Sequence, residues 1–186
     1  MSSATTALER LAIGVASIAL SVGLIALLSG FFAGRDPAGV GGGTLVAAVR
    51  YPDQGHSHLA PGELRPVYDS EPPTSGPHIP LPIGRDETAL SDDQLLEALE
   101  LGDVVLAYGS RRPNPALLAL QRAVAGPFTP RLAAAGQAVV LDRRPGTSGV
   151  IALAWTRMLH VASAADPRLG EFTGQWLGRQ ASGGSR

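Results

Sequence analysis

Three of the four histidines lie within one proline-rich stretch, residues 51–78. His56 and His58 occur in the sequence Tyr-Pro-Asp-Gln-Gly-His-Ser-His, and His78 ends the string Pro-Pro-Thr-Ser-Gly-Pro-His. The neutral imidazole nitrogen is a common ligand of zinc and copper in proteins. The clustering therefore predicts a transition-metal site built from His56, His58 and His78. The fourth histidine, His160, follows an apolar stretch, where a packed or capped side chain is the usual role.

Oxygen ligands for the same site are expected from a helix that follows the proline-rich stretch. Glu97 and Glu100 are separated by three positions and share a helix face. We assign Glu100 as a fourth ligand and interpret Glu97 as part of a solvated acidic face. The chain has no cysteine, which excludes disulfides, thiol nucleophiles and thiolate metal sites. Any metal must therefore be held by nitrogen and oxygen.

The backbone around the histidines is expected to be stiff, because proline fixes its own φ and pushes the preceding residue toward extended conformations. Residues 51–84 are therefore predicted to form an extended loop with one flexible turn, Thr74-Ser75-Gly76. Gly76 can adopt a positive φ at little cost. A reversal at Gly76 would direct His78 back toward the folded domain.

Several motifs are similar to those of a known family. They are Gly55-His56-Ser57-His58, Tyr68 followed by residues 72–78, Leu99-Glu100 with Gly102 before Val104-Val105-Leu106, and Ala154-Trp155. On these residues the chain resembles the bacterial membrane-anchored proteins grouped as domain of unknown function 3105. The family pattern His-x-Leu-Glu-His-Gly corresponds to residues 97–102, where this chain has glutamate and leucine in place of the two histidines. The resemblance implies that this member has lost part of any histidine site that the family holds.

The first part of the chain is predicted to anchor it to a membrane. Residues 11–34 are roughly 24 uncharged residues, which as a helix would span about 36 Å against a hydrocarbon core of about 30 Å. Residues 1–10 form a short N-terminal flank, and the glycine-rich residues 35–44 form a flexible tether. The short flank and the family resemblance place the domain outside the cytoplasm, on a single-pass protein of the cell membrane.

Residues 45–180 are expected to form one α/β or α+β domain, a small mixed sheet covered by helices. Helices are predicted from Ser91 to Gly102, over residues 114–124 and over residues 167–177. Strands are predicted at residues 44–51, 103–108, 137–142 and 149–159, the last as one central strand. Residues 181–186 are predicted to be a disordered tail.

Composition and motifs leave two main functions open. Basic and acidic residues are nearly equal in number, 15 and 16, and are interleaved along the chain, which argues against nucleic-acid binding. The first hypothesis is a copper or zinc site outside the cytoplasm. The alternative is a non-enzymatic structural or interaction module, in which the proline-rich loop docks onto a membrane protein complex. A hydrolytic set of Ser75, Asp69 and a histidine is disfavoured because no strand-to-helix elbow places Ser75.

Overall fold

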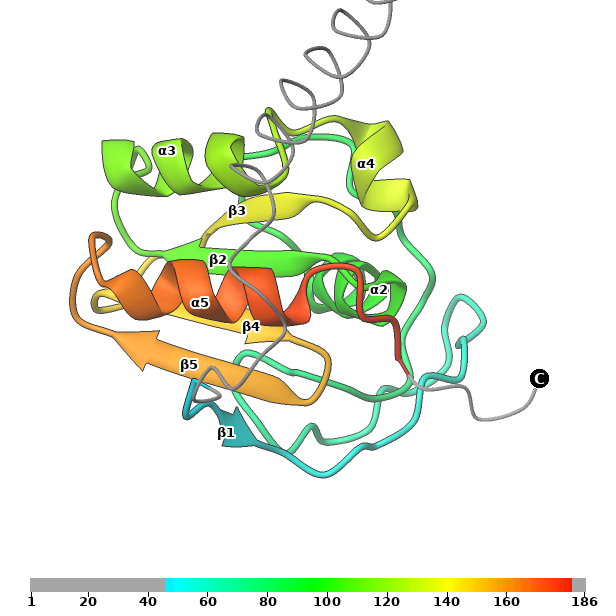
Figure 1. The fold of residues 1–186 in the computed structure, drawn as a ribbon. Helices are drawn as coiled ribbons and strands as arrows, with labels where there is room; N and C mark the ends of the chain where they lie inside the picture. Colours follow the sequence, from blue (N-terminus) through cyan, green and yellow to red (C-terminus); the bar gives the residue numbers. More distant parts are fainter. Residues whose placement is uncertain (1–45, 182–186) are drawn as a thin grey trace, which may run out of the picture. The chain divides into compact units, whose positions relative to one another are not determined.

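The structure is a computed structural model and describes residues 46–181. The described chain contains one short strand, then a long loop, and then four helices and four further strands (Figure 1). In chain order these are β1 (Val49–Arg50), α2 (Asp92–Leu101), β2 (Val104–Tyr108), α3 (Pro115–Val124), α4 (Pro130–Ala134), β3 (Val139–Arg143), β4 (Val150–Ala154), β5 (Arg157–Val161) and α5 (Pro167–Trp176).

The strands form one mixed sheet in the order β1-β5-β4-β2-β3. Strands β2 and β3 are parallel, with Val104 paired to Val139, and the other neighbours are antiparallel. Helices α2 and α4 contribute to the apolar cluster on one face of the sheet, and α3 and α5 contribute to the cluster on the other. The prediction of a small mixed sheet covered by helices is thus confirmed.

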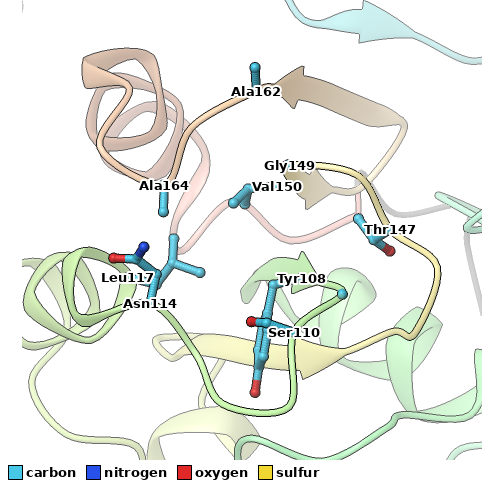
Figure 2. A pocket seen from close by; sticks show the side chains of 10 residues that line it. Tyr108, Ser110, Asn114, Leu117, Thr147, Gly149, Val150, Ala162 and Ala164 are labelled. Carbon is cyan, nitrogen blue, oxygen red and sulfur yellow. The ribbon is translucent and has the colours of Figure 1, made fainter.

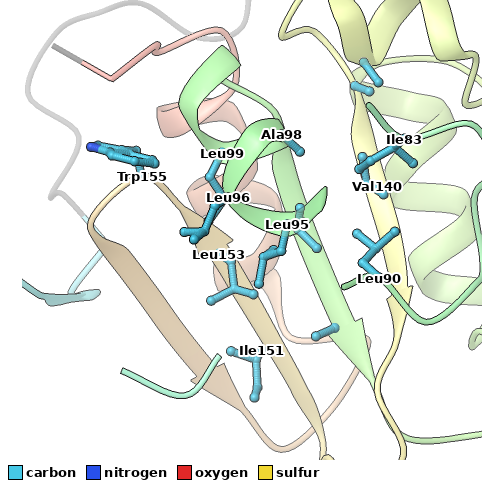
Figure 3. Close-up of a cluster of buried hydrophobic side chains, with 14 of the residues drawn as sticks. Ile83, Leu90, Leu95, Leu96, Ala98, Leu99, Val140, Ile151, Leu153 and Trp155 are labelled. Carbon is cyan, nitrogen blue, oxygen red and sulfur yellow. The ribbon is translucent and has the colours of Figure 1, made fainter. Parts of the chain in front are cut away.

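Helix α2, which carries the two candidate glutamates, is fixed by strong end signals and by its apolar face. Ser91 and Gln94 form a capping box at its start, as predicted, and Gly102 closes it in the left-handed conformation with φ 106°. Leu95, Leu96 and Leu99 are completely buried against the sheet, beside Leu153 and Val140 (Figure 3). Burial of three leucines in this way is worth roughly 1.5–3 kcal/mol each. The helix is therefore a rigid base for whatever its other face carries.

The predicted central strand over residues 149–159 is confirmed in its first half, because β4 lies in the middle of the sheet. Its continuation as one strand is wrong: the chain turns tightly at Trp155-Thr156 and returns as the antiparallel strand β5. Thr156 adopts a positive φ of 59°, which is rare for a β-branched residue. Because the turn contains neither glycine nor asparagine, the sequence carries no ordinary signal for it. His160 consequently lies within β5 rather than beyond the end of a strand.

Two further elements differ from the prediction. Only Val49 and Arg50 of the first predicted strand pair with β5, so the edge strand is much shorter than expected. The short helix α4 was not predicted, although Thr129 caps it and Pro130 occupies its first turn. The other helices agree with prediction to within about one residue at each end.

The predicted flank, transmembrane helix and tether, residues 1–10, 11–34 and 35–44, lie outside the described residues. Among residues 46–181, no helix is both long and apolar enough to cross a membrane. Of the predicted tail, only Ala181 is described, and its backbone N–H donates to the carbonyl of Glu100 at 2.9 Å.

Candidate metal centre

Two segments of the proline-rich loop lie side by side and bring His58 and His78 together. The two residues form an isolated parallel bridge, in which the N–H of Leu59 donates to the carbonyl of His78 at 2.8 Å. A second backbone bond joins the N–H of Gly76 to the carbonyl of Gly55 at 2.9 Å. Gly76 has the predicted positive φ, 128°. The predicted positive φ of Gly76 is therefore confirmed, but the predicted reversal there is wrong, because residues 76–78 continue in parallel beside residues 55–59.

Helix α2 places both glutamates opposite these histidines. Glu100 Oε2 lies 3.4 Å from Nε2 of both His58 and His78, and Glu97 Oε2 lies 3.4 Å from His78 Nε2. One donor atom from each of the four residues lies within 4.8 Å of the other three. The interpretation of Glu97 as a solvated side chain is wrong, because only 17% of the side chain is exposed.

The hydrogen bonding of His78 defines which of its nitrogens faces the carboxylates. His78 Nδ1 lies 3.0 Å from the carbonyl oxygen of Gly76, and a carbonyl only accepts, so Nδ1 carries the proton. In the neutral ring Nε2 then has no hydrogen and can only accept a hydrogen bond. It faces two carboxylate oxygens, which also can only accept hydrogen bonds when the carboxylates are ionised. His78 Nε2, Glu97 Oε2 and Glu100 Oε2 are all buried without a hydrogen-bond partner. Such an arrangement of acceptors requires a cation or a proton between them.

The spacing of the donor atoms can be compared with hydrogen-bond lengths and with the ligand spacing of a metal site. Hydrogen bonds between nitrogen and oxygen are usually 2.7–3.2 Å long, with about 2.7–2.9 Å for charged pairs, whereas three donor distances here are 3.4 Å. Ligands about 2.0–2.1 Å from a tetrahedral zinc ion are separated by about 3.3–3.4 Å. These three distances are longer than usual hydrogen bonds and match three of the six edges of such a tetrahedron, while the four atoms as a group lie within 4.8 Å of one another.

His56 contacts the other oxygen of Glu100. Its Nδ1 lies 3.3 Å from Glu100 Oε1, and its ring meets the Trp155 ring edge to face with centroids 6.2 Å apart. Trp155 in turn donates from Nε1 to Asp53 Oδ2 at 3.2 Å. The structure therefore brings three of the four predicted ligands, His58, His78 and Glu100, into the cluster and places His56 behind Glu100. His160 lies apart from the cluster on β5, with Nε2 3.0 Å from Met158 Sδ.

A buried aspartate at the start of α2 holds the loop beside His78. Asp93 Oδ1 accepts from the backbone N–H of Ile79 at 3.0 Å, and the carboxylate also pairs with the Arg65 guanidinium. The hydrogen bond from Arg65 lowers the pKa of Asp93, and the Ile79 N–H lowers it further against the opposing effect of burial. The loop is thus fastened to the same helix that carries Glu97 and Glu100.

Tyr68 packs on the turn that orients His78. Its hydroxyl donates to the carbonyl of Pro77 at 2.9 Å, and a Cβ added to Gly76 would lie 2.8 Å from Tyr68 Cε1. Burial raises the pKa of Tyr68, so the hydroxyl remains a donor at neutral pH. Glycine is required at position 76 both by its φ and by this close approach.

Ser75 has a structural role. It is completely buried, its hydroxyl accepts from the N–H of Gln54 at 3.1 Å, and it donates to the carbonyl of Pro52 at 3.1 Å. The hydroxyl thus uses both its donor and its acceptor to join the two loop segments. The arrangement gives no support to a nucleophilic serine.

A pocket of about 260 Å³ lies elsewhere, lined by residues within 108–117, 147–150 and 162–164 (Figure 2). Its walls are mostly small or apolar, with Ser110, Asn114 and Thr147 as polar groups. The Asn114 side chain accepts from the N–H of Ala116 and so caps α3. The pocket shares no residue with the histidine and glutamate cluster.

The fold and the cluster define a small α/β domain with a two-histidine, two-glutamate constellation between a loop and a helix. A family model described as protein of unknown function (DUF3105) matches residues 63–184, well over half of the chain. The chain belongs to this family, as the loop motifs indicated. No curated protein and no solved structure matches the chain.

The sequence did contain a signal for Glu97. It occupies the first histidine position of the family pattern, three residues before Glu100 on the same helix face. Carboxylate and imidazole are both ligands of zinc and copper, so a glutamate there keeps a donor at the site. The second replaced position, Leu101, carries no donor.

Proposed function

We propose that this protein binds one divalent zinc or copper ion through His58, His78, Glu97 and Glu100, outside the cytoplasm and close to a membrane. One observation carries the proposal: three buried acceptor atoms without hydrogen-bond partners converge from a loop and a helix. Two ionised carboxylates and two neutral imidazoles also carry a charge that one divalent cation neutralises. The membrane anchor rests on the apolar residues 11–34 of the sequence.

The ligand types favour zinc or copper over harder ions. Two imidazoles with two carboxylates suit Zn²⁺ and Cu²⁺, whereas Mg²⁺ and Ca²⁺ prefer an all-oxygen environment. Copper(II) binds most tightly among the divalent ions of the series, so metal supply would decide which ion is bound.

In this proposal His56 orients a ligand rather than binding the ion. Its Nδ1 lies 3.3 Å from Oε1, whereas Oε2 of Glu100 is the oxygen near His58 and His78. Contacts with the outer oxygen of a ligating carboxylate orient the inner oxygen. Trp155 fixes the His56 ring in turn through their edge-to-face contact.

The test is to measure bound zinc and copper on the full chain purified in mild detergent. We expect one ion per chain for the wild type and for His160→Ala, the matched control in which the fourth histidine is removed. We expect His58→Ala and His78→Ala to lower the bound ion well below one per chain. Unchanged stoichiometry in both variants would contradict the proposal.

A second candidate function is docking onto a membrane protein complex, without catalysis. Leu64 and Val67, three residues apart on the proline-rich loop, are 93% and 92% exposed, so both apolar side chains are available to a partner. Proline-rich segments are preorganised for recognition. This reading predicts a complex that survives mild detergent without metal and is lost in the double variant Leu64→Asp, Val67→Asp. Survival of the complex in that variant would exclude this surface.

A further inference from the structure

The four proposed ligands differ sharply in exposure. The His78 side chain is fully buried, and those of Glu97 and Glu100 are 17% and 20% exposed, whereas 52% of the His58 side chain is exposed. The three converging acceptor atoms of the other ligands have no contact with solvent. An incoming group can therefore approach a bound ion most easily on the side of His58.

His58 is also held differently from His78. The ring of His78 is fixed at Nδ1 by the Gly76 carbonyl, and Gly76 is itself packed against Tyr68. The His58 ring contacts Glu100 Oε2 and meets the His78 ring edge to face. Both of those contacts lie on the cluster side of the ring, so it can leave the cluster without breaking into the core.

Charge restricts what can take the place of His58. With both carboxylates ionised, the site around a divalent ion is neutral, and replacement of one neutral imidazole by another preserves that neutrality. An anionic thiolate or carboxylate would leave a net negative charge in a partly buried site, which is costly. Of the side chains that usually bind zinc, only imidazole is neutral, so the favoured replacement is a second imidazole.

We propose that His58 is the replaceable ligand of this centre, through which the ion is exchanged with a partner that presents a histidine side chain. The inference rests on the proposed metal-binding function and adds to it a route and a partner chemistry. In the exchange the incoming imidazole nitrogen forms a bond to the ion as the bond to His58 Nε2 breaks. His78, Glu97 and Glu100 hold the ion during this first replacement, and their bonds to it break afterwards as further donor groups of the partner take their places. Neither the ion nor a ligand is oxidised or reduced.

Chemical rescue of the full chain tests this route. We expect His58→Ala to lower the Zn²⁺ affinity at least about 10-fold, because loss of an outer-shell contact alone lowers metal affinity by that factor. Millimolar imidazole should restore the affinity. Acetate at the same concentration should not restore it. His78→Ala should not be rescued by imidazole, because the space it leaves is closed to solvent. Rescue of both variants or of neither would overturn the proposal.

A second measurement does not depend on any variant. For the wild type loaded with Zn²⁺, the rate of transfer to an acceptor peptide containing histidine should rise in proportion to the peptide concentration. A rate independent of that concentration would mean that the ion leaves before the acceptor arrives and would overturn the proposal. If the wild type binds no ion at all, the proposed function fails. If it binds one ion but shows neither rescue nor concentration dependence, only the exchange route fails.

Discussion

His58 and His78 lie on two loop segments that pair as a single parallel bridge, with their ring centroids 5.5 Å apart at an interplanar angle of 69°. Neither segment belongs to the main sheet, and the loop is held by scattered hydrogen bonds. An ion that joins both rings to α2 would tie the loop to the best-packed helix of the domain.

Metal removal should therefore loosen the loop and lower stability. A ligand that binds only the folded state stabilises it by about 2.7 kcal/mol at 100 times its dissociation constant. We expect Zn²⁺ to raise the melting temperature of the wild type by several degrees and a chelator to reverse the rise. Calorimetry measures both. The same additions should leave His78→Ala unchanged, and a comparable rise in that variant would place the ion elsewhere.

Substitutions at Glu97 should separate its role as a ligand from a role in packing. Glu97→Gln weakens the oxygen donor at Oε2, so we expect Zn²⁺ affinity to fall at least about 10-fold. Glu97→His, which introduces the residue of the family pattern, should retain binding with a greater preference for Cu²⁺. Titration calorimetry measures the affinities, with Glu171→Gln on α5 as the matched control. Equal affinity of Glu97→Gln and the control would remove Glu97 from the site.

His56→Asn should distinguish an orienting residue from a ligand. The contact of His56 with Glu100 Oε1 predicts that the variant still binds one ion, with an affinity lowered about 10- to 100-fold. Metal content at saturation and the dissociation constant should be measured together. Complete loss of the ion at saturation would make His56 a direct ligand.

Gly76→Ala should disturb the turn that orients His78. The substitution places a Cβ 2.8 Å from Tyr68 Cε1 in a backbone conformation with φ 128°, and such strain costs about 1–3 kcal/mol. We expect lower stability in denaturant and weaker metal binding. Gly84→Ala in the same loop is the control, because no atom lies within 4 Å of its added Cβ. Similar losses in both variants would argue against a specific role of Gly76.

Asp103 should make stability depend on pH. Burial raises its pKa to about 7, although its Oδ1 accepts from the N–H of Ala138 at 2.7 Å. Because the unfolded pKa is about 3.9, the folded state holds the proton more tightly between about pH 4 and pH 7. Stability is therefore lost as pH rises through this window, by about 1.4 kcal/mol for each unit of pKa difference.

Asp103→Asn keeps an acceptor for Ala138 and removes the titration. Denaturant unfolding of metal-free protein from pH 4 to pH 8 should show that the variant gains stability relative to the wild type as pH rises. A constant difference between the two proteins across this range would contradict the role of Asp103.

Local signals explain which parts of the fold could be predicted. The capping box at Ser91, the Asn114-Pro115 start of α3 and the buried run Val104–Tyr108 each determine their element from neighbouring residues alone. The turn at Trp155-Thr156 has no such signal, because Thr156 takes its positive φ only under the constraint of the two strands.

The candidate site was predictable in its residue types but not in its geometry. The clustering of histidines in the proline-rich loop indicated that their rings come together, and the bridge between His58 and His78 agrees with that. The positions of Glu97 and His56 depend on how α2 lies against the loop, which is determined by contacts such as that of Asp93 with Ile79. Long-range contacts of this kind leave no periodic trace in the sequence.

The two glutamates and the two histidines of the centre are held by different kinds of structure. Glu97 and Glu100 project from a helix that packs into the core, whereas His58 and His78 lie on loop backbone outside the main sheet. A change in ionic radius would be absorbed mainly at the half-exposed His58, without repacking any leucine beneath α2. The domain is thereby suited to bind ions of different size at the same site. The supply of each metal, more than the geometry of the ligands, would decide which ion occupies the site.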